Sequence, residues 1–206
     1  MSKKKELKNI IEEYDGIVTT KIVEDNNIHR EYLSKMVKEG DLERVAYGVY
    51  ITPETWEDQM MILQLKRKKM IYSHETALYL NDLTDRDPIS YVVTVPNGYN
   101  PTRLKEDGLV VHTVKKELFH LGMCYRETIF GNQVKTYNKE RAICDVFRDR
   151  NNQDPAIVSD SIKRYLSSNK RDLNKLIKYA ELMRVKEVVM PYLDVILWVN
   201  QQVWKH

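Results

Sequence analysis

Residues 19–51 constrain the fold of this chain most, because they read as a short helix, a tight turn, a second helix and a hairpin. Thr19 and Thr20 carry hydroxyl groups that satisfy the unbonded amides at the start of a helix, which predicts a short helix over residues 21–25. Two asparagines follow, and the second, Asn27, tolerates the left-handed backbone that a tight turn requires.

Apolar residues after this turn recur at helical spacing, which predicts a second helix over residues 29–39 with one buried stripe. Gly40 stands where a glycine commonly ends a helix, and residues 42–51 form a hairpin that turns at Tyr47 and Gly48. An amphipathic helix upstream completes a three-helix core. Together these elements predict a winged helix-turn-helix. The apolar residues of the two longer helices are Leu7, Ile10, Ile11 and Tyr14, then Ile28, Tyr32, Leu33, Met36 and Val37.

The charge of this segment does not identify its partner. Residues 1–52 hold nine Lys and Arg against ten Asp and Glu, whereas a strongly basic domain would indicate nucleic acid directly. Helix-turn-helix units also serve as protein-binding modules, and that alternative stays open. The placement of charge favours DNA, because lysines cluster at the N-terminus, whereas acidic residues lie at the far end of the first helix and on the short helix over residues 21–25.

A winged helix-turn-helix that binds DNA inserts its second helix into the major groove and braces the first on the backbone. We therefore expect Arg30, Ser34 and Lys35 nearest the base edges, with the threonines, lysines and wing residues on phosphates. The predicted DNA-binding residues are Lys3, Lys4, Lys5, Thr19, Thr20, Lys21, His29, Arg30, Ser34, Lys35, Lys38, Arg44 and Tyr47.

The remainder of the chain predicts a mixed sheet followed by helices. A connecting helix is expected over residues 56–69, and another over 71–80 that Ser73 opens. Strands follow at 90–95, 109–114, 123–129 and 133–136. From residue 139 a helical period returns in four segments, the last at 186–204, where Pro191 should kink or divide the helix. The fold class is therefore α+β, with a DNA-binding domain at 1–52 and a second domain at 53–206.

Composition excludes several classes of protein. The chain has 206 residues, of which 42% are hydrophobic and 31% charged, so a disordered protein is excluded. No apolar run approaches a membrane span and the N-terminus lacks a signal sequence, which predicts a cytoplasmic protein without membrane contact. Cys124 and Cys144 have no partner pair, so we expect two small buried side chains, no zinc site of the usual spacing and no cofactor.

The sequence offers little for catalysis. It contains no glycine-rich phosphate loop and no HExxH motif. His74 beside Glu75, and His112 with His120, are interpreted as ordinary core or surface residues. Arg141 and Asp145 stand four apart on an expected helix, which predicts a structural ion pair. We therefore expect no enzymatic activity and no metal ligands.

Four short motifs occur in a fixed order along the chain: VAYGVY at 45–50, SHETAL at 73–78, VTVP at 93–96, and Tyr137 with Glu140, Arg141 and Asp145. In this order and spacing they resemble the AbiEi antitoxins of bacterial abortive-infection systems, and the resemblance covers nearly the whole chain. The chain departs from the usual pattern at Asn27, where many members have glycine.

The resemblance implies both a repressor and an antitoxin. Its partners would be double-stranded DNA, at inverted repeats in its own promoter, and a nucleotidyltransferase-like toxin encoded beside it. The system would be a type IV toxin-antitoxin pair that limits phage spread, with no stable complex assumed. The winged helix would autoregulate, and the second domain would counteract the toxin.

Two alternatives remain. The first is a winged-helix regulator with no toxin, whose second domain senses a ligand or makes dimers. The second is an enzyme that acts through His74, Glu75 or Asp145. A basic excess in residues 121–206, fifteen Lys and Arg against ten Asp and Glu, indicates either added phosphate contacts or a solvated surface.

Overall fold

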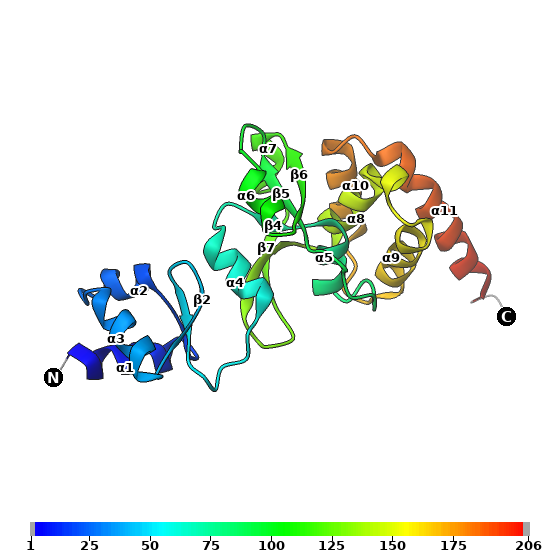
Figure 1. Cartoon of the computed structure of the whole chain (residues 1–206). Coiled ribbons are helices and arrows are strands. Elements are labelled where there is room, and N and C mark those ends of the chain that lie inside the picture. Colours follow the sequence, from blue (N-terminus) through cyan, green and yellow to red (C-terminus); the bar gives the residue numbers. More distant parts are fainter. Residues whose placement is uncertain (1–2, 204–206) are drawn as a thin grey trace. The chain divides into compact units, whose positions relative to one another are not determined.

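The computed structural model describes residues 3–203, and the side chains of residues 3–195. The chain folds into two compact units (Figure 1). The first comprises Met1–Lys68 and Glu127–Val134, and the second comprises Lys69–Arg126 and Lys135–His206. The predicted boundary after residue 52 separates a DNA-binding domain from a second domain by their expected functions, and it stays a prediction.

The N-terminal unit contains the predicted three-helix core. The Oγ1 of Thr19 accepts a hydrogen bond from the backbone N–H of Ile22 at 3.2 Å, which confirms the expected cap. The helices are α1 (Lys3–Glu13), α2 (Thr20–Asp25) and α3 (Glu31–Glu39). Their buried apolar residues are Leu7, Ile10, Ile11, Val18, Val23, Ile28, Leu33, Met36, Leu42 and Tyr50.

The two predicted turns have the expected backbone. Asn27 adopts φ 55° between α2 and α3, and Gly40 ends α3 at φ 80°. The start of the second helix was predicted two residues early, because α3 begins at Glu31. The ring of His29 lies ahead of the helix, where its Nδ1 accepts the backbone N–H of Glu31 at 3.3 Å.

The wing is part of a three-stranded sheet. β2 (Glu43–Ala46) and β3 (Val49–Ile51) form the predicted hairpin, and the turn glycine, Gly48, has φ 71°. β1 (Ile17–Thr19) pairs with β3 on the other side, giving the order β1-β3-β2. The sequence did not predict β1, because three residues are too few to show a period of two.

Two aromatic residues lie outside the helices that were predicted to contain them. Tyr14 follows α1 and is 46% exposed, and Trp56 precedes α4 (Gln59–Lys66) and is 79% exposed. The helix α4 starts late because Asp58 is its N-cap, with Oδ1 accepting the N–H of Met61 at 3.1 Å. The buried residues of this helix are Met60, Ile62, Leu63 and Gln64.

A five-stranded mixed sheet forms the centre of the second half of the fold, in the order β6-β5-β4-β8-β7. β4 is antiparallel to β5 and parallel to β8, while β5 and β6 are parallel. Residues 71 and 72 were predicted as helix but form the central strand β4, and the helix begins at His74 after Ser73. The strands are β4 (Ile71–Tyr72), β5 (Val92–Pro96), β6 (Val110–Val114), β7 (Met123–Glu127) and β8 (Gln133–Tyr137).

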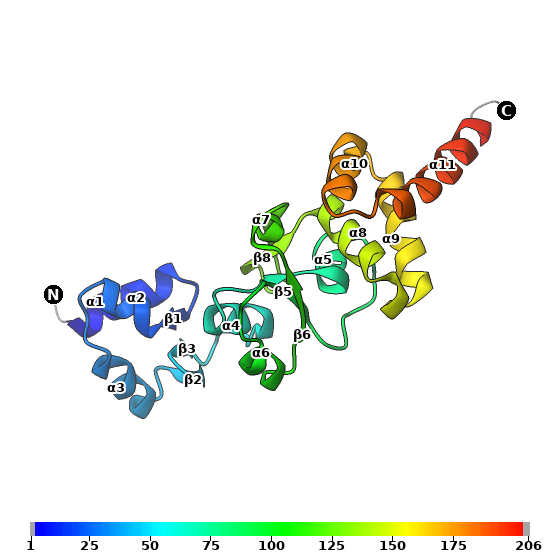
Figure 2. The same ribbon diagram turned by 90° about the horizontal axis from the view of Figure 1, so that it is seen from above.

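Helices pack beside this sheet, and α5 contacts both β5 and α8 (Figure 2). Two short helices, α6 and α7, and the 3-10 turn η1 were not predicted. The remaining elements are α5 (His74–Leu80), α6 (Thr102–Glu106), α7 (Lys116–Phe119), α8 (Lys139–Arg148), η1 (Arg150–Asn152), α9 (Pro155–Ser167), α10 (Leu173–Leu182) and α11 (Lys186–Val203).

Pro191 lies inside α11, which continues through it. Of the two predicted effects, a kink or a division, the division is therefore wrong. Pro191 is exposed, and the carbonyl group that loses its helical partner therefore has water available. The predicted end of the helix at Trp204 lies outside the described residues. Among residues 3–203, no helix combines the length and apolar character that crossing a bilayer demands.

Candidate nucleic-acid interface

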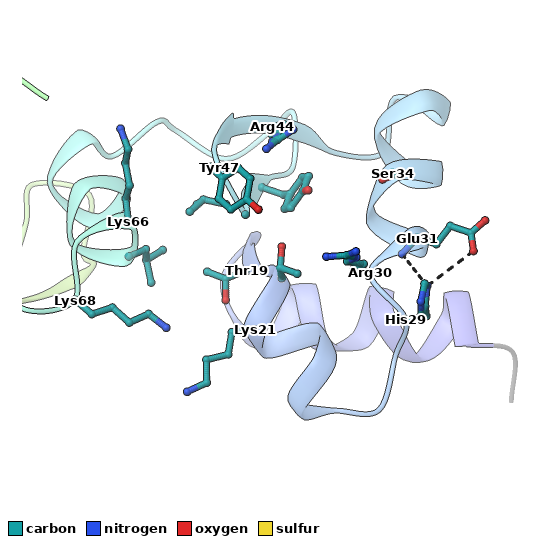
Figure 3. Close-up of a pocket in the computed structure, with 15 residues that line it drawn as sticks. Thr19, Lys21, His29, Arg30, Glu31, Ser34, Arg44, Tyr47, Lys66 and Lys68 are labelled. Carbon is teal, nitrogen blue, oxygen red and sulfur yellow. Dashed lines mark hydrogen bonds and ion pairs between the residues drawn. The ribbon is translucent and has the colours of Figure 1, made fainter. Parts of the chain in front are cut away.

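A concave surface forms within the N-terminal unit between α2, α3, the wing and the end of α4. Figure 3 shows Arg30 reaching from the start of α3 toward Thr19, with Tyr47 above them on the wing. The residues that line the concave surface are Thr19, Thr20, Lys21, His29, Arg30, Glu31, Ser34, Arg44, Tyr47, Gly48, Val49, Tyr50, Leu65, Lys66 and Lys68.

The tip of the wing presents a cation and an aromatic ring together. The guanidinium carbon of Arg44 lies 5.3 Å from the centre of the Tyr47 ring, which is a cation–π distance. The Nε of Arg44 also donates to the carbonyl of Ala46 at 3.4 Å. The two side chains therefore contact each other. Tyr47 is 84% exposed, so this pair remains accessible to a ligand.

Basic residues outnumber acidic residues on this surface, although the unit as a whole is nearly neutral. Five of its lining residues are Lys or Arg and one, Glu31, is acidic. A concave surface of one charge concentrates the field and attracts the opposite charge. The fold therefore gathers basic residues on one surface, which the nearly neutral net charge of residues 1–52 did not indicate.

The structure brings eight of the predicted site residues together and leaves the others elsewhere in the unit. Thr19 is 8% exposed, and its hydroxyl already caps α2. The eight lining residues are Thr19, Thr20, Lys21, His29, Arg30, Ser34, Arg44 and Tyr47.

The N-terminal lysines have acidic neighbours. Lys4 pairs with Glu39 and lies 3.3 Å from Asp41, and these contacts raise its pKa, the hydrogen bond to Glu39 most. Lys3 lies 3.0 Å from Glu6. Lys5 also lies on α1, outside the lining of the concave surface.

Two further predicted lysines lie on α3 beyond the concave surface. Lys35 lies 3.6 Å from Glu31 and 5.5 Å from the centre of the Tyr32 ring. Lys38 occupies the last turn of the helix and is exposed. These two side chains therefore lie on the exposed face of α3, outside the concave surface.

Lys66 and Lys68 are lining residues that the predicted site omitted. They belong to a run of four basic residues at 66–69, and basic residues in the last turn of a helix also interact favourably with the helix dipole. This run of basic residues was the sequence feature that could have indicated a contact with nucleic acid. Its position beside the wing depends on the fold and does not follow from spacing in the sequence.

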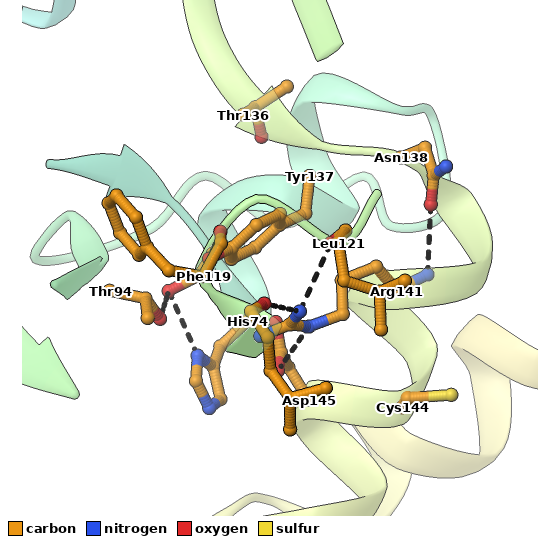
Figure 4. Close-up of polar contacts among 12 residues, drawn as sticks. His74, Thr94, Phe119, Leu121, Thr136, Tyr137, Asn138, Arg141, Cys144 and Asp145 are labelled. Carbon is orange, nitrogen blue, oxygen red and sulfur yellow. Dashed lines mark hydrogen bonds and ion pairs between the residues drawn. The ribbon is translucent and has the colours of Figure 1, made fainter. Parts of the chain in front are cut away.

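The predicted ion pair between Arg141 and Asp145 is confirmed, with Nε and Oδ1 3.0 Å apart (Figure 4). Arg141 also donates to the carbonyl groups of Leu118 at 2.7 Å and Leu121 at 3.1 Å. Both charged residues are buried. The pair therefore connects α8 to the segment around α7, which is a structural arrangement.

The two cysteines differ in burial. Cys144 is fully buried, as expected, and burial raises the pKa of its thiol. Cys124 is only half-buried, which corrects the prediction that both are core residues. Burial raises the pKa of Cys124 as well. Neither thiol is activated in the manner of a nucleophile.

Residues 5–53 match the model of a family described as "Transcriptional regulator, AbiEi antitoxin". This range contains the three helices, the turn and the wing. None of the curated proteins matches the chain.

Among solved structures, the chain is similar to the RV2827C protein from Mycobacterium tuberculosis, with a TM-score of 0.54 and 11% identity. The match covers 81% of this chain and 66% of that chain, just under two thirds. At this identity the similarity concerns the fold alone. The family match rests on the N-terminal segment alone: residues 5–53 of this chain are similar to the AbiEi antitoxin and transcriptional-regulator family.

Proposed function

We propose that this protein represses its own operon by binding inverted repeats in the promoter, and that it counteracts a nucleotidyltransferase-like toxin. The observation that carries the first part is the basic concave surface between α2, α3, the wing and α4. Such a surface follows the backbone of a duplex, while the start of α3 faces the major groove.

Specific contacts are assigned to the start of α3. Arg30 is the N-cap residue of this helix, and Ser34 lies one turn further along the same side. Arginine bonds guanine through two acceptors in the major groove, and serine accepts or donates to any base. Both point into the concavity, so base reading belongs to Arg30 and Ser34.

Phosphate contacts are assigned to the basic residues around that helix. Lys21 lies on α2, Arg44 on the wing, and Lys66 and Lys68 at the end of α4. These positions surround the concave surface, as residues that hold two strands of a backbone must. Each phosphate neutralised makes affinity depend more steeply on salt.

Fluorescence-anisotropy titration of a labelled promoter duplex tests this proposal. Arg30→Glu should weaken binding to the promoter, while Lys38→Ala should lower affinity on all sequences alike. Wild-type affinity for the promoter in both variants would show that α3 is not the recognition helix.

The antitoxin activity is assigned to residues 53–206, with no stable complex with the toxin assumed. Its support is the family of the N-terminal domain, whose description includes an antitoxin. Co-expression with the neighbouring gene tests it in the full chain. The Arg30→Glu variant should lose repression and keep rescue from toxicity, whereas loss of both activities together would contradict the division.

A regulator that senses a ligand is the second candidate, and one observation favours it. The second unit contains a cleft of about 570 Å³ lined by His112, Asp149 and Glu75, among others. Burial raises the pKa of Glu75. The reading frame beside this gene separates the candidates, because a nucleotidyltransferase there favours the antitoxin and its absence favours the sensor.

A further inference from the structure

Two histidines and an aspartate from separate elements meet in the second unit. His74 is the first residue of α5, His112 is the central residue of β6, and Asp149 follows the last residue of α8. One possible ligand atom from each lies within 4.8 Å of the others. The segments that supply them are far apart in the sequence, and only the fold assembles them.

The two imidazole rings lie face to face, with centres 3.9 Å apart and planes 23° from parallel. The Nε2 of His112 lies 3.8 Å from Oδ2 of Asp149. His74 is 5% exposed, so its ring has little access to bulk water. A buried imidazole beside a second imidazole and a carboxylate is a set of donors that divalent transition metals prefer.

Hydrogen bonds orient His74 and leave one nitrogen for an ion. Its Nδ1 lies 3.0 Å from the Ser73 hydroxyl, which accepts a hydrogen bond from the Thr94 hydroxyl at 2.9 Å (Figure 4). Metal-binding histidines have such a partner on the ring nitrogen that does not face the metal. When Nδ1 carries the proton, the lone pair of Nε2 is available to an ion.

Asp149 is oriented in the same way. Its Oδ1 accepts the side-chain amide of Asn152 at 2.7 Å, and its Oδ2 accepts that of Gln153 at 3.1 Å. Each carboxylate oxygen has a second lone pair after these bonds are made. The carboxylate is therefore fixed in position and retains the capacity to bind a cation.

The backbone at His74 is held in an uncommon conformation. It has φ 51°, a left-handed conformation, although it is not a glycine. Residues held in such conformations cluster at functional sites, because the surrounding structure must maintain the strain. The strain positions the ring of His74 beside His112.

The cleft next to these residues has the charge that a cation requires. His112 and Asp149 line it, together with Glu75, Asp87 and an ion pair in which Arg86 lies 2.7 Å from Asp154. The cleft gives an ion a path to these residues. It also leaves space for water or another ligand on the side of the ion that the protein does not cover. Acidic walls raise the local concentration of cations.

We infer that His74, His112 and Asp149 bind one divalent transition-metal ion of the zinc class beside this cleft. Ligands on a tetrahedral zinc ion are roughly 3.4 Å apart, given bonds of about 2.0–2.1 Å. The donor atoms, which lie within 4.8 Å of one another, therefore move closer when the ion binds, and the His112 ring turns out of its stack with His74 so that the two lone pairs converge. His112 and Asp149 are only half-buried, so rotation of their side chains supplies that movement.

Titration of the full-length, chelator-treated protein with Co²⁺ tests the site, because four- or five-coordinate Co²⁺ absorbs visible light strongly. We expect one ion per chain and competition by Zn²⁺. His112→Gln and Asp149→Asn should each weaken binding at least tenfold. The matched control is His120→Gln, an exposed histidine at the end of α7, which should bind as wild type.

Thermal unfolding separates loss of a ligand from loss of the fold. In chelator the two variants should melt within a few degrees of wild type, and Zn²⁺ should raise the melting temperature only of wild type and His120→Gln. Wild-type affinity in His112→Gln would overturn the assignment. So would loss of the ion in His29→Gln, which would place it in the other unit, or failure of Co²⁺ to bind wild type.

Discussion

Arg141 donates from Nε to Oδ1 of Asp145 across 3.0 Å, one turn apart on α8 and fully enclosed by the second unit. The guanidinium also lies 4.2 Å from the centre of the Tyr137 ring. Among the described residues, Arg141 Nη2 and Asp145 Oδ2 have no hydrogen-bond partner. The pair therefore holds neighbouring segments together, although two of its buried atoms lack a hydrogen-bond partner.

Removal of one member of this pair should destabilise the protein strongly. Arg141→Ala leaves a buried carboxylate without its counter-charge, which costs about 3–5 kcal/mol. Urea unfolding followed by circular dichroism measures the loss. The double variant Arg141→Met with Asp145→Leu should recover much of the stability, because it buries no charge. Single variants as stable as wild type would contradict a structural role for the pair.

Asn27 offers a test of the turn between α2 and α3. Its φ of 55° is left-handed, so Asn27→Gly should be neutral or slightly stabilising. Asn27→Val should lose about 1–2 kcal/mol, because a branched side chain clashes in this conformation. Thermal unfolding of both variants measures the difference. Equal stability of the valine variant would mean that the turn is not strained.

The cap of α2 makes a smaller and equally local prediction. Thr19→Ala removes the bond from Oγ1 to the N–H of Ile22 and should cost about 1 kcal/mol. Thr19→Ser keeps the hydroxyl and is the matched control. Chemical denaturation compares the three proteins, and an alanine variant as stable as the serine variant would argue against the cap.

Short-range rules predicted much of the N-terminal unit. A cap, a left-handed asparagine and a C-terminal glycine each depend on a few consecutive residues, and Thr19, Asn27 and Gly40 all have the expected geometry. The winged helix was predictable for that reason.

Contacts between distant segments could not be predicted in this way. Ile71 and Tyr72 form the central strand only because β5 and β8 pair with it on either side. The meeting of His74 with His112 has the same origin. The sequence placed these histidines 38 positions apart, and nothing in their spacing indicated that their rings would stack.

The end of α4 should contribute to the electrostatic part of DNA affinity. Replacement of both Lys66 and Lys68 by alanine should weaken binding on every sequence and reduce the salt slope by about 2, one for each phosphate that is no longer neutralised. Anisotropy titrations at several salt concentrations measure the slope. The control is Lys105→Ala combined with Lys116→Ala, because both lysines are exposed on helices of the other unit and the double replacement makes the same change in charge. A slope unchanged in the double variant would remove α4 from the interface.

The central claim is that the concave surface of the N-terminal unit binds the promoter through the start of α3. An anisotropy titration of promoter and scrambled duplexes with wild type, Arg30→Glu and Lys105→Glu tests it most directly. Lys105 is an exposed residue of α6 in the other unit, and its replacement makes the same change in charge. We predict that Arg30→Glu weakens promoter binding at least tenfold, about 1.4 kcal/mol, and that Lys105→Glu binds as wild type. Equal affinity of wild type and Arg30→Glu for the promoter would contradict the claim.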